Sequence, residues 1–199
     1  MKRSILSGLA AFAIGSLSFV AYAQSCNSQT VDDAPTSRYQ ANADGTATDL
    51  QTGLMWMRCA MGQTWDAGNS TCTGQATTFS WQGALQAAQA LDQGAGFAGY
   101  TDWRLANLRE LMSIERYHCS NPAINLDIFP ATPAQAFWSS SPLEISVNVA
   151  WTLDFGSANA SDDLMQSTYA IRLVRAGAYD NKLPPATSST AAAVVNYRR

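Results

Sequence analysis

The sequence predicts a single α+β domain in which two helices pack on antiparallel strands. Two segments in the first half of the chain repeat apolar residues at helical spacing, and two segments in the second half alternate them with a period of two. At 199 residues the chain can form one hydrophobic core. Because helices and strands are segregated along the chain, we expect the helices to cover one side of a sheet.

Residues 1–23 have the pattern of a secretory signal peptide. Two basic residues precede an apolar run over residues 5–20, and the sequence AYA at residues 21–23 supplies a small-x-small cleavage site. A membrane anchor is the alternative, but the run is short for a bilayer span and contains Ser and Gly. We expect cleavage before Gln24, an exported protein, and no transmembrane segment after cleavage.

The charge of the mature chain argues against nucleic-acid binding. Loss of Lys2 and Arg3 leaves 10 of the 12 basic residues against 15 acidic residues, a net charge of −5. Nucleic acid requires a concentrated basic surface, and in the mature chain only Arg198 and Arg199 are adjacent basic residues. We therefore expect no nucleic-acid partner.

All four cysteines lie in the mature chain and predict two disulfides, as is usual for an even number in an exported protein. A zinc site would need close Cys-x-x-Cys pairs or several histidines, and the chain has one histidine, His118. Cys59 and Cys72 end a short Gly/Asn/Ser-containing loop, so we expect them to pair with each other. Cys26 and Cys119 then form the second bridge, and we expect no cofactor and no bound metal.

The first part of the mature chain is expected to be a polar leader, residues 24–37, followed by a hairpin or small meander over residues 38–58. Asp-Gly at 44–45 and Thr-Gly at 52–53 are turn signals that separate short strand-like segments in this meander. Residues 59–72 follow as a loop.

Ser80 can cap a helix over residues 81–92, which the glycines of residues 94–99 would terminate. Asn107 can cap a second helix, and Glu110 three residues later completes a capping box. The apolar stripe predicted for the first helix consists of Trp81, Ala84, Leu85, Ala88 and Leu91.

In the second half, period-two alternation predicts strands over residues 151–155 and 169–173. The polar, turn-forming segment 156–168 between them is expected to be a long hairpin loop. Residues 178–199 contain a Pro pair and are biased to Ser, Thr and Ala, which indicates a weakly ordered tail.

No set of residues has the spacing of a catalytic or metal centre. A Cys119–His118 nucleophile pair is disfavoured because a disulfide-bonded cysteine cannot act as a nucleophile. Asp162 and Asp163, with Asn159 nearby, could offer oxygens to calcium, but calcium needs six to eight ligands. We therefore predict no catalytic residue and no metal ligand.

Recognition residues are expected on the long connections between the later strands, residues 142–149 and 156–167, since such loops often carry binding functions. The candidates for ligand binding are Asn159, Asp162 and Asp163. Trp65, inside the loop of residues 59–72, is the remaining candidate, because an exposed Trp could stack on a sugar.

Six segments of the chain resemble one family in their order and spacing. They are GLMWMRC (53–59), GYTDWRLANLREL (99–111), NPAINLDIFP (121–130), FWSSSP (137–142), AWTLDF (150–155) and YAIRLVRAG (169–177). Over residues 38–177 the chain resembles the Lcl C-terminal-like domain, named for the C-terminal domain of the Legionella collagen-like adhesin and formerly a domain of unknown function. Ala106 departs from this pattern, since the family usually has Pro there.

The resemblance implies a C-type-lectin-like fold and an exported bacterial protein that is periplasmic, cell-surface or secreted. Surface adhesion and binding of sulfated glycans are attributed to the namesake domain. The calcium-site motifs of true C-type lectins and the copper-binding cysteine pair of the similar formylglycine-generating enzymes have no match in this chain.

Arg104 directly precedes the second predicted helix, between Trp103 and Leu105. We interpret it as structural, together with Trp103, Asn107 and Glu110, because the fixed donors of Arg suit it to joining carbonyls or a carboxylate where chain segments cross. Asp102 or a backbone carbonyl of the terminal strands is its expected partner.

The sequence as a whole predicts an exported, disulfide-stabilised, non-catalytic binding module that recognises a glycan or a surface protein. A periplasmic enzyme that uses a carboxylate pair such as Asp162 and Asp163 is one alternative. A structural partner in an envelope assembly is another.

Overall fold

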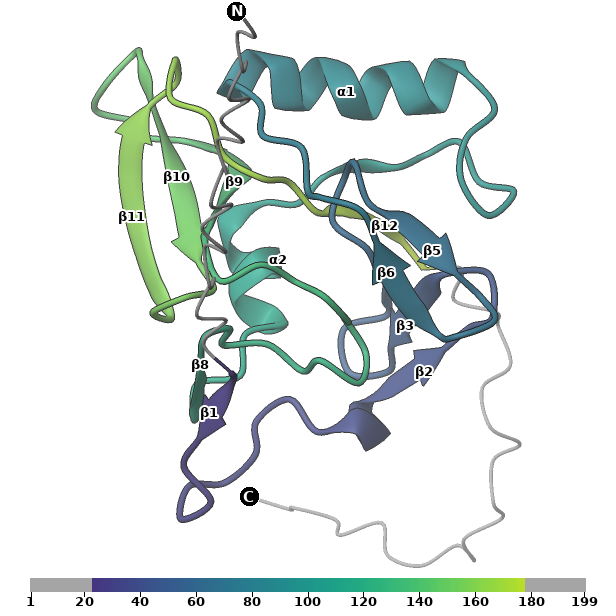
Figure 1. The fold of residues 1–199 in the computed structure, drawn as a ribbon. Coiled ribbons are helices and arrows are strands. Elements are labelled where there is room, and N and C mark those ends of the chain that lie inside the picture. The colour runs from purple at the N-terminus through teal and green to yellow at the C-terminus, as the bar shows by residue number, and fades with distance from the viewer. Residues whose placement is uncertain (1–22, 178–199) are drawn as a thin grey trace, which may run out of the picture.

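The computed structural model describes residues 23–177, which form antiparallel sheets and two helices (Figure 1). The expected α+β class is confirmed. The signal peptide expected over residues 1–23, apart from Ala23, and the tail expected over residues 178–199 lie outside the described residues. Within the described part of the chain, no helix has the length and apolar character needed to cross a membrane.

The central sheet has five strands in the order β2-β3-β4-β12-β7 and joins the start of the domain to its end. Its first three strands are the predicted meander, and Gly45 and Gly53 lie in its two turns with positive φ angles of 86° and 73°. The strands are β2 (Tyr39–Ala41), β3 (Thr46–Asp49), β4 (Leu54–Met57), β12 (Leu173–Ala176) and β7 (Arg104–Leu105).

A second sheet of three strands, in the order β11-β10-β9, lies on the other side of α2 in Figure 1. It comprises β9 (Ala136–Pro142), β10 (Val149–Asp154) and β11 (Asn159–Leu164). The expectation of a long loop over residues 156–168 is wrong, because six of these residues form β11, which pairs antiparallel with β10. β11 is a polar edge strand whose side chains are mostly exposed, so it lacks the buried face that produces apolar alternation.

Both predicted helix caps are present. α1 (Trp81–Gln93) begins after Ser80, whose Oγ accepts a hydrogen bond from the amide of Gly83 at 3.2 Å. α2 (Leu108–Ser113) begins after Asn107 with a complete capping box to Glu110. The predicted stripe of α1 is correct for Ala84 and Ala88, which are buried, but Leu85 lies at the margin of the stripe and is exposed.

The two predicted disulfides, Cys26–Cys119 and Cys59–Cys72, are present. The first joins β1 (Ser25–Cys26) to β8 (Cys119–Ser120) and so attaches the leader to the domain. The leader continues through a 3₁₀ turn, η1 (Thr36–Arg38), into the central sheet. The segment enclosed by the second disulfide is more regular than the expected loop, because its backbone pairs as a hairpin of β5 (Thr64–Asp66) and β6 (Thr71–Thr73).

The core lies between the two larger sheets and the helices, and it contains the fully buried Trp56, Trp103 and Trp138. Arg172 is also completely buried there. Its guanidinium donates to the carbonyls of Met57 and Arg58, at 2.9 and 2.6 Å, and to the hydroxyl of Thr132. Arg172 therefore joins the last strand region to the meander.

Arg104 does not have the partner expected from the sequence. Its side chain is 47% exposed and binds Glu110, whereas Asp102 accepts two hydrogen bonds from Arg175. The reason is the position of Arg104 beside the N-terminus of α2, where the capping carboxylate of Glu110 lies within reach. Arg172 donates to backbone carbonyls across the fold, and so does Arg58, which donates to the carbonyls of Asp127 and Ile128.

Candidate functional site

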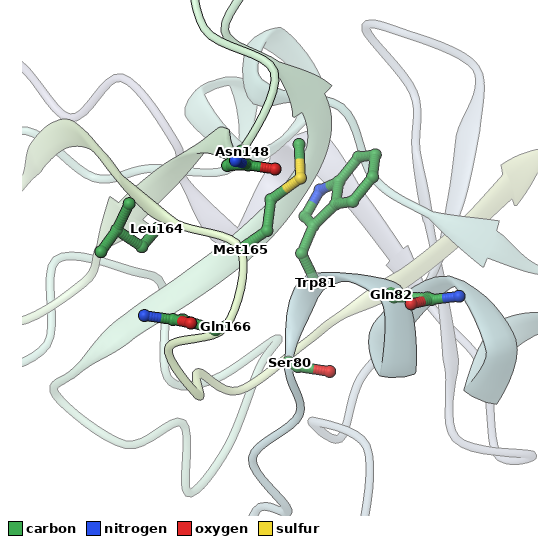
Figure 2. A pocket seen from close by; sticks show the side chains of 7 residues that line it. All are labelled: Ser80, Trp81, Gln82, Asn148, Leu164, Met165 and Gln166. Carbon is green, nitrogen blue, oxygen red and sulfur yellow. The ribbon is translucent and has the colours of Figure 1, made fainter.

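The larger of the two described clefts lies where the N-terminus of α1 meets the end of the β10–β11 hairpin. It is open to solvent and has a volume of about 850 Å³ (Figure 2). Three separate chain segments contribute side chains to it. The lining residues are Ser80, Trp81, Gln82, Asn148, Leu164, Met165 and Gln166.

Backbone hydrogen bonds hold these three segments together. The amide of Trp81 donates to the carbonyl of Met165 at 2.9 Å, and the amide of Met165 donates to the carbonyl of Asn148, also at 2.9 Å. The indole of Trp81 is fixed from its other side, because its Nε1 donates to the carbonyl of Ser139 at 2.9 Å. The cleft is thus built on a helix and a sheet, which gives its lining a defined geometry.

The lining combines apolar surface with neutral polar groups. Met165 lies alongside the half-buried ring of Trp81 in Figure 2, and Leu164 is 48% exposed across the cleft. Gln82, Asn148 and Gln166 supply exposed amides, each of which has both donors and an acceptor. Among the seven lining residues none carries a charge, so the cleft suits a neutral ligand that has apolar faces and hydroxyl groups.

Asp163, one of the predicted ligand-binding residues, holds the turn that carries the cleft residues Met165 and Gln166. Its Oδ1 accepts from the amide of Leu164 at 2.6 Å and from the hydroxyl of Ser167 at 3.3 Å, and its Oδ2 accepts from the hydroxyl of Tyr169. The hydrogen bond from Tyr169, together with that from the Leu164 amide, lowers the pKa of the Asp163 carboxyl. The Asp163 carboxylate therefore stabilises the turn after β11, beside the cleft.

The other two polar candidates on β11 do not line this cleft. Asp162 is exposed opposite Trp151 on β10, and because adjacent residues of a strand point to opposite faces, it does not converge with Asp163. Asn159 pairs with Asp154 at the far end of β11, about 17 Å along the strand from Leu164. The structure does not bring the three predicted residues together.

Trp65 lies in the β5–β6 hairpin and lines neither of the described clefts. Its Nε1 donates to the carbonyl of Ala43 at 2.8 Å, and the guanidinium of Arg58 lies 4.2 Å from its ring centroid. A Cβ on Gly45 would come within 2.7 Å of the indole, so the ring packs tightly on this turn. Through these contacts Trp65 attaches the β5–β6 hairpin to the meander of β2, β3 and β4.

A second, smaller hollow of about 460 Å³ lies beside the β9–β10 connection, between this connection and α2. Its lining includes Leu143, Ile145 and Trp151. Ile145 is 91% exposed and the neighbouring Val147 is 90% exposed. This connection is one of the two segments in which the sequence predicted recognition residues.

Sequence reasoning missed Ser80, Trp81 and Gln82 as lining residues of a cleft, whereas the other four lining residues lie in the connections 142–149 and 156–167, where recognition residues were expected. Helical periodicity assigns Trp81 to the apolar stripe of α1, although a residue at the first helical position projects from the end of the helix as well as from its side. An aromatic residue at this position, followed directly by an amide residue, is the signal that could have indicated an accessible ring.

Fold and cleft together define a disulfide-stabilised α+β domain that carries an open, uncharged cleft. The chain belongs to the Lcl C-terminal domain family, whose family model matches residues 45–175. This match lies within the domain predicted over residues 38–177. Comparison with curated proteins found no match.

Proposed function

We propose that the mature protein is an exported, non-catalytic binding module that recognises a neutral glycan in the cleft beside Trp81. The observation that carries this proposal is the half-buried indole of Trp81 beside the exposed amides of Gln82, Asn148 and Gln166. Sugars present apolar C–H faces that stack on aromatic rings and hydroxyls that pair with amide groups.

The size of the cleft fits this class of ligand. Small-molecule sites have volumes of roughly 300–1,000 Å³, and the cleft has about 850 Å³. Because it is open, a glycan attached to a larger chain could enter with one or two of its sugar units. This favours the recognition of exposed saccharides on a surface.

Charge favours a neutral glycan over the sulfated glycans attributed to the namesake of the family. Sulfate groups bind most strongly to basic partners, whereas none of the seven residues lining the cleft is basic. The expected mature chain also has a net charge of −5. Sulfate would therefore have no basic side-chain partner in this cleft.

The proposal includes the C-type-lectin-like fold that the resemblance implies. Its support is the pairing of the terminal strand β12 with β4 of the first meander, together with two helices and a separate sheet that carries long connections. Such a scaffold places ligand contacts on the connections, and the cleft residues Asn148, Met165 and Gln166 lie on connections of this kind.

A non-catalytic role is supported by the divergence of Asp162 and Asp163, the example of a carboxylate pair considered for the enzyme alternative, which point to opposite faces of β11. Export is supported by the two disulfides, which persist in oxidising compartments. We propose a periplasmic, cell-surface or secreted location, in agreement with the signal pattern of residues 1–23.

A glycan array that displays neutral and sulfated saccharides, probed with the oxidised mature protein, tests this proposal. The affinity for the best ligand is then measured by calorimetry for Gln82→Ala and Gln166→Ala. Each should bind about tenfold more weakly, because each loses a hydrogen bond to the ligand.

Gln86→Ala is the matched control, since Gln86 is exposed on the same helix but does not line the cleft. It should bind like the unmodified protein. Equal affinities for the Gln82 and Gln86 variants, or binding only to sulfated saccharides, would contradict the proposal.

A surface protein as ligand is the second candidate, favoured by the exposure of Ile145 and Val147 beside the smaller hollow. In this case Ile145→Ser should abolish adhesion to target cells while Gln82→Ala leaves adhesion unchanged. Adhesion that disappears when the cells are deglycosylated would argue for the glycan instead.

A further inference from the structure

A second cluster of polar groups lies where the leader crosses the segment before β8, away from the cleft beside Trp81. Asp32 and Asp33 of the leader face His118, and one ligand atom from each lies within 4.8 Å of the others. His118 Nδ1 is 3.6 Å from Oδ1 of Asp33 and 3.9 Å from Oδ1 of Asp32. Their proximity could not be predicted from the sequence, since 84 residues or more separate the acids from the histidine.

The ring nitrogen that faces the two acids is buried without a partner. The His118 side chain is 8% exposed, and its Nδ1 makes no hydrogen bond among the described residues. Leaving a buried polar nitrogen unpaired costs free energy. The two distances are too long for hydrogen bonds, which span about 2.7–3.2 Å, but they approach the ligand–ligand separation of about 3.4 Å around a tetrahedral zinc ion.

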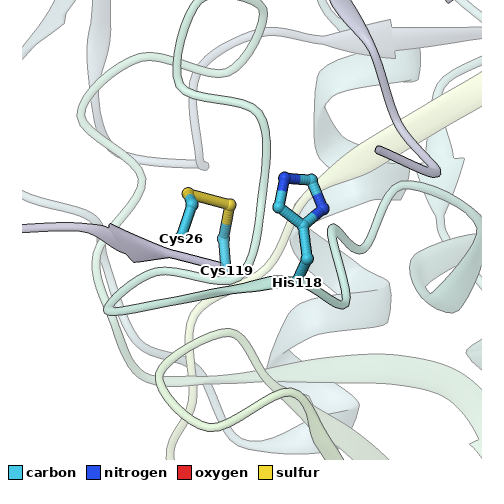
Figure 3. Close-up of side chains that lie close together, drawn as sticks. All are labelled: Cys26, His118 and Cys119. Carbon is cyan, nitrogen blue, oxygen red and sulfur yellow. A yellow bond between two sulfur atoms is a disulfide. The ribbon is translucent and has the colours of Figure 1, made fainter. Parts of the chain in front are cut away.

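The groups are held in place by their surroundings. The Cys26–Cys119 disulfide lies beside the His118 ring (Figure 3), and the amide of Asn27 donates to the carbonyl of His118 at 2.7 Å. Both bonds fix the leader against the segment that carries the ring. The cysteine sulfurs themselves are joined to each other, so they are not available as thiolate ligands.

The two carboxylates are oriented by different partners. Arg116 binds Asp32 through both of its oxygens, and the amide of Ala34 also donates to Asp32 Oδ1. The amide of Tyr117 donates to Asp33 Oδ2 at 3.4 Å, which leaves Asp33 Oδ1 directed at the ring. Hydrogen bonds of this kind orient the ligands of metal sites.

We propose that His118 Nδ1 and one oxygen each from Asp32 and Asp33 bind a divalent transition-metal ion, for which Zn²⁺ is the probe. The imidazole nitrogen favours such an ion over Ca²⁺, which prefers six to eight oxygens. The carboxylates are 31% and 36% exposed, so water can enter and complete the coordination. Arg116 offsets part of the negative charge, and the affinity should lie below that of structural zinc sites with four protein ligands.

The ion would join the leader to the second half of the domain, in addition to the disulfide. Because His118 is the only histidine of the chain, ¹⁵N NMR of its ring reports on this site without ambiguity. The tag-free mature protein is first treated with a chelator and then titrated with Zn²⁺. We expect a large shift of the Nδ1 resonance and a rise in the melting temperature of a few degrees.

Asp33→Asn and His118→Gln should weaken Zn²⁺ binding at least tenfold. Asp162→Asn, which changes an exposed acid on β11, is the control and should bind like the unmodified protein. Ca²⁺ should not shift the ring nitrogens. Ring resonances that stay unchanged at saturating Zn²⁺, or an Asp33→Asn variant with full affinity, would overturn the proposal even if His118→Gln failed to fold.

Discussion

Arg104 and Glu110 form a bidentate ion pair across the start of α2. Nη1 of Arg104 donates to Oε2 of Glu110 at 2.7 Å, and Nη2 donates to Oε1 at 2.6 Å. Oε2 of Glu110 also accepts from the amide of Asn107 at 2.8 Å, the hydrogen bond that completes the capping box. Arg104 therefore orients the carboxylate that caps the helix, a role different from the buried chain crossing that its sequence context suggested.

Arg104→Ala should lower the free energy of unfolding by about 1 kcal/mol. The side chain is 47% exposed, and ion pairs in contact with water contribute little because solvent screens them. The cap itself remains, since Asn107 still accepts from the amide of Glu110. Urea denaturation measures the change, and a loss above about 3 kcal/mol would indicate a role for Arg104 that these contacts do not explain.

Arg172→Ala should be far more damaging and should cost about 3–5 kcal/mol. Burial lowers the pKa of Arg172 to about 9, so the group stays charged at neutral pH. Its removal would leave the carbonyls of Met57 and Arg58 without their donor and open a cavity beside Phe129. Urea denaturation of Arg172→Ala and Arg104→Ala under the same conditions measures both losses of unfolding free energy. Equal losses for the two variants would contradict this prediction.

Glu115→Gln should change the pH dependence of stability. Burial, together with the negative charge of Asp33, raises the pKa of Glu115 from 4.5 to about 7. Between these two values the folded protein holds a proton that the unfolded chain releases, so the free energy of unfolding falls as the pH rises through this window and levels off above it. The contribution of this one group is about 3 kcal/mol.

The measurement for Glu115 is urea denaturation at several pH values in the presence of a chelator. Glu115→Gln should remove this part of the fall between pH 4.5 and 7. Glu144→Gln, on the exposed β9–β10 connection, is the control and should retain it. A Glu115→Gln variant with the pH profile of the unmodified protein would show that folding does not raise the pKa of Glu115.

Binding of a neutral glycan in the cleft should be nearly independent of salt. Since none of the seven lining residues is charged, screening by added ions has no charge pair to weaken. Calorimetry between roughly 50 and 500 mM NaCl should give affinities within about twofold of each other. An affinity that fell steeply with salt would point to an acidic or sulfated ligand bound elsewhere on the domain.

Local signals predicted the parts of the fold that depend on neighbouring residues. The caps at Ser80 and Asn107 involve residues three positions apart, and the Cys59–Cys72 bridge closes a short loop. β11 was missed because an exposed edge strand has no apolar face to produce alternation. Its existence depends on hydrogen bonds to β10, which the sequence of residues 159–164 does not reveal.

The candidate site was the least predictable part because it depends on contacts between distant segments. Residues 80–82, 148 and 164–166 meet only after α1 and the β10–β11 hairpin have packed together. The ion-pair partners of Arg104 and Arg175 were equally difficult to predict from the sequence. Asp102 lies close to Arg104 in the sequence, but the pairing of β7 with β12 places Arg175 beside it instead.

The most direct test of the central proposal is a map of ligand contacts by ¹H–¹⁵N NMR. The ¹⁵N-labelled mature protein is titrated with the neutral saccharide that binds best on the array. The largest shifts should occur at the amides of residues 80–82, 148 and 164–166 and at the indole N–H of Trp81. Shifts centred on the β5–β6 hairpin with Trp65, and absent from these cleft residues, would contradict the assignment of the cleft as the glycan site.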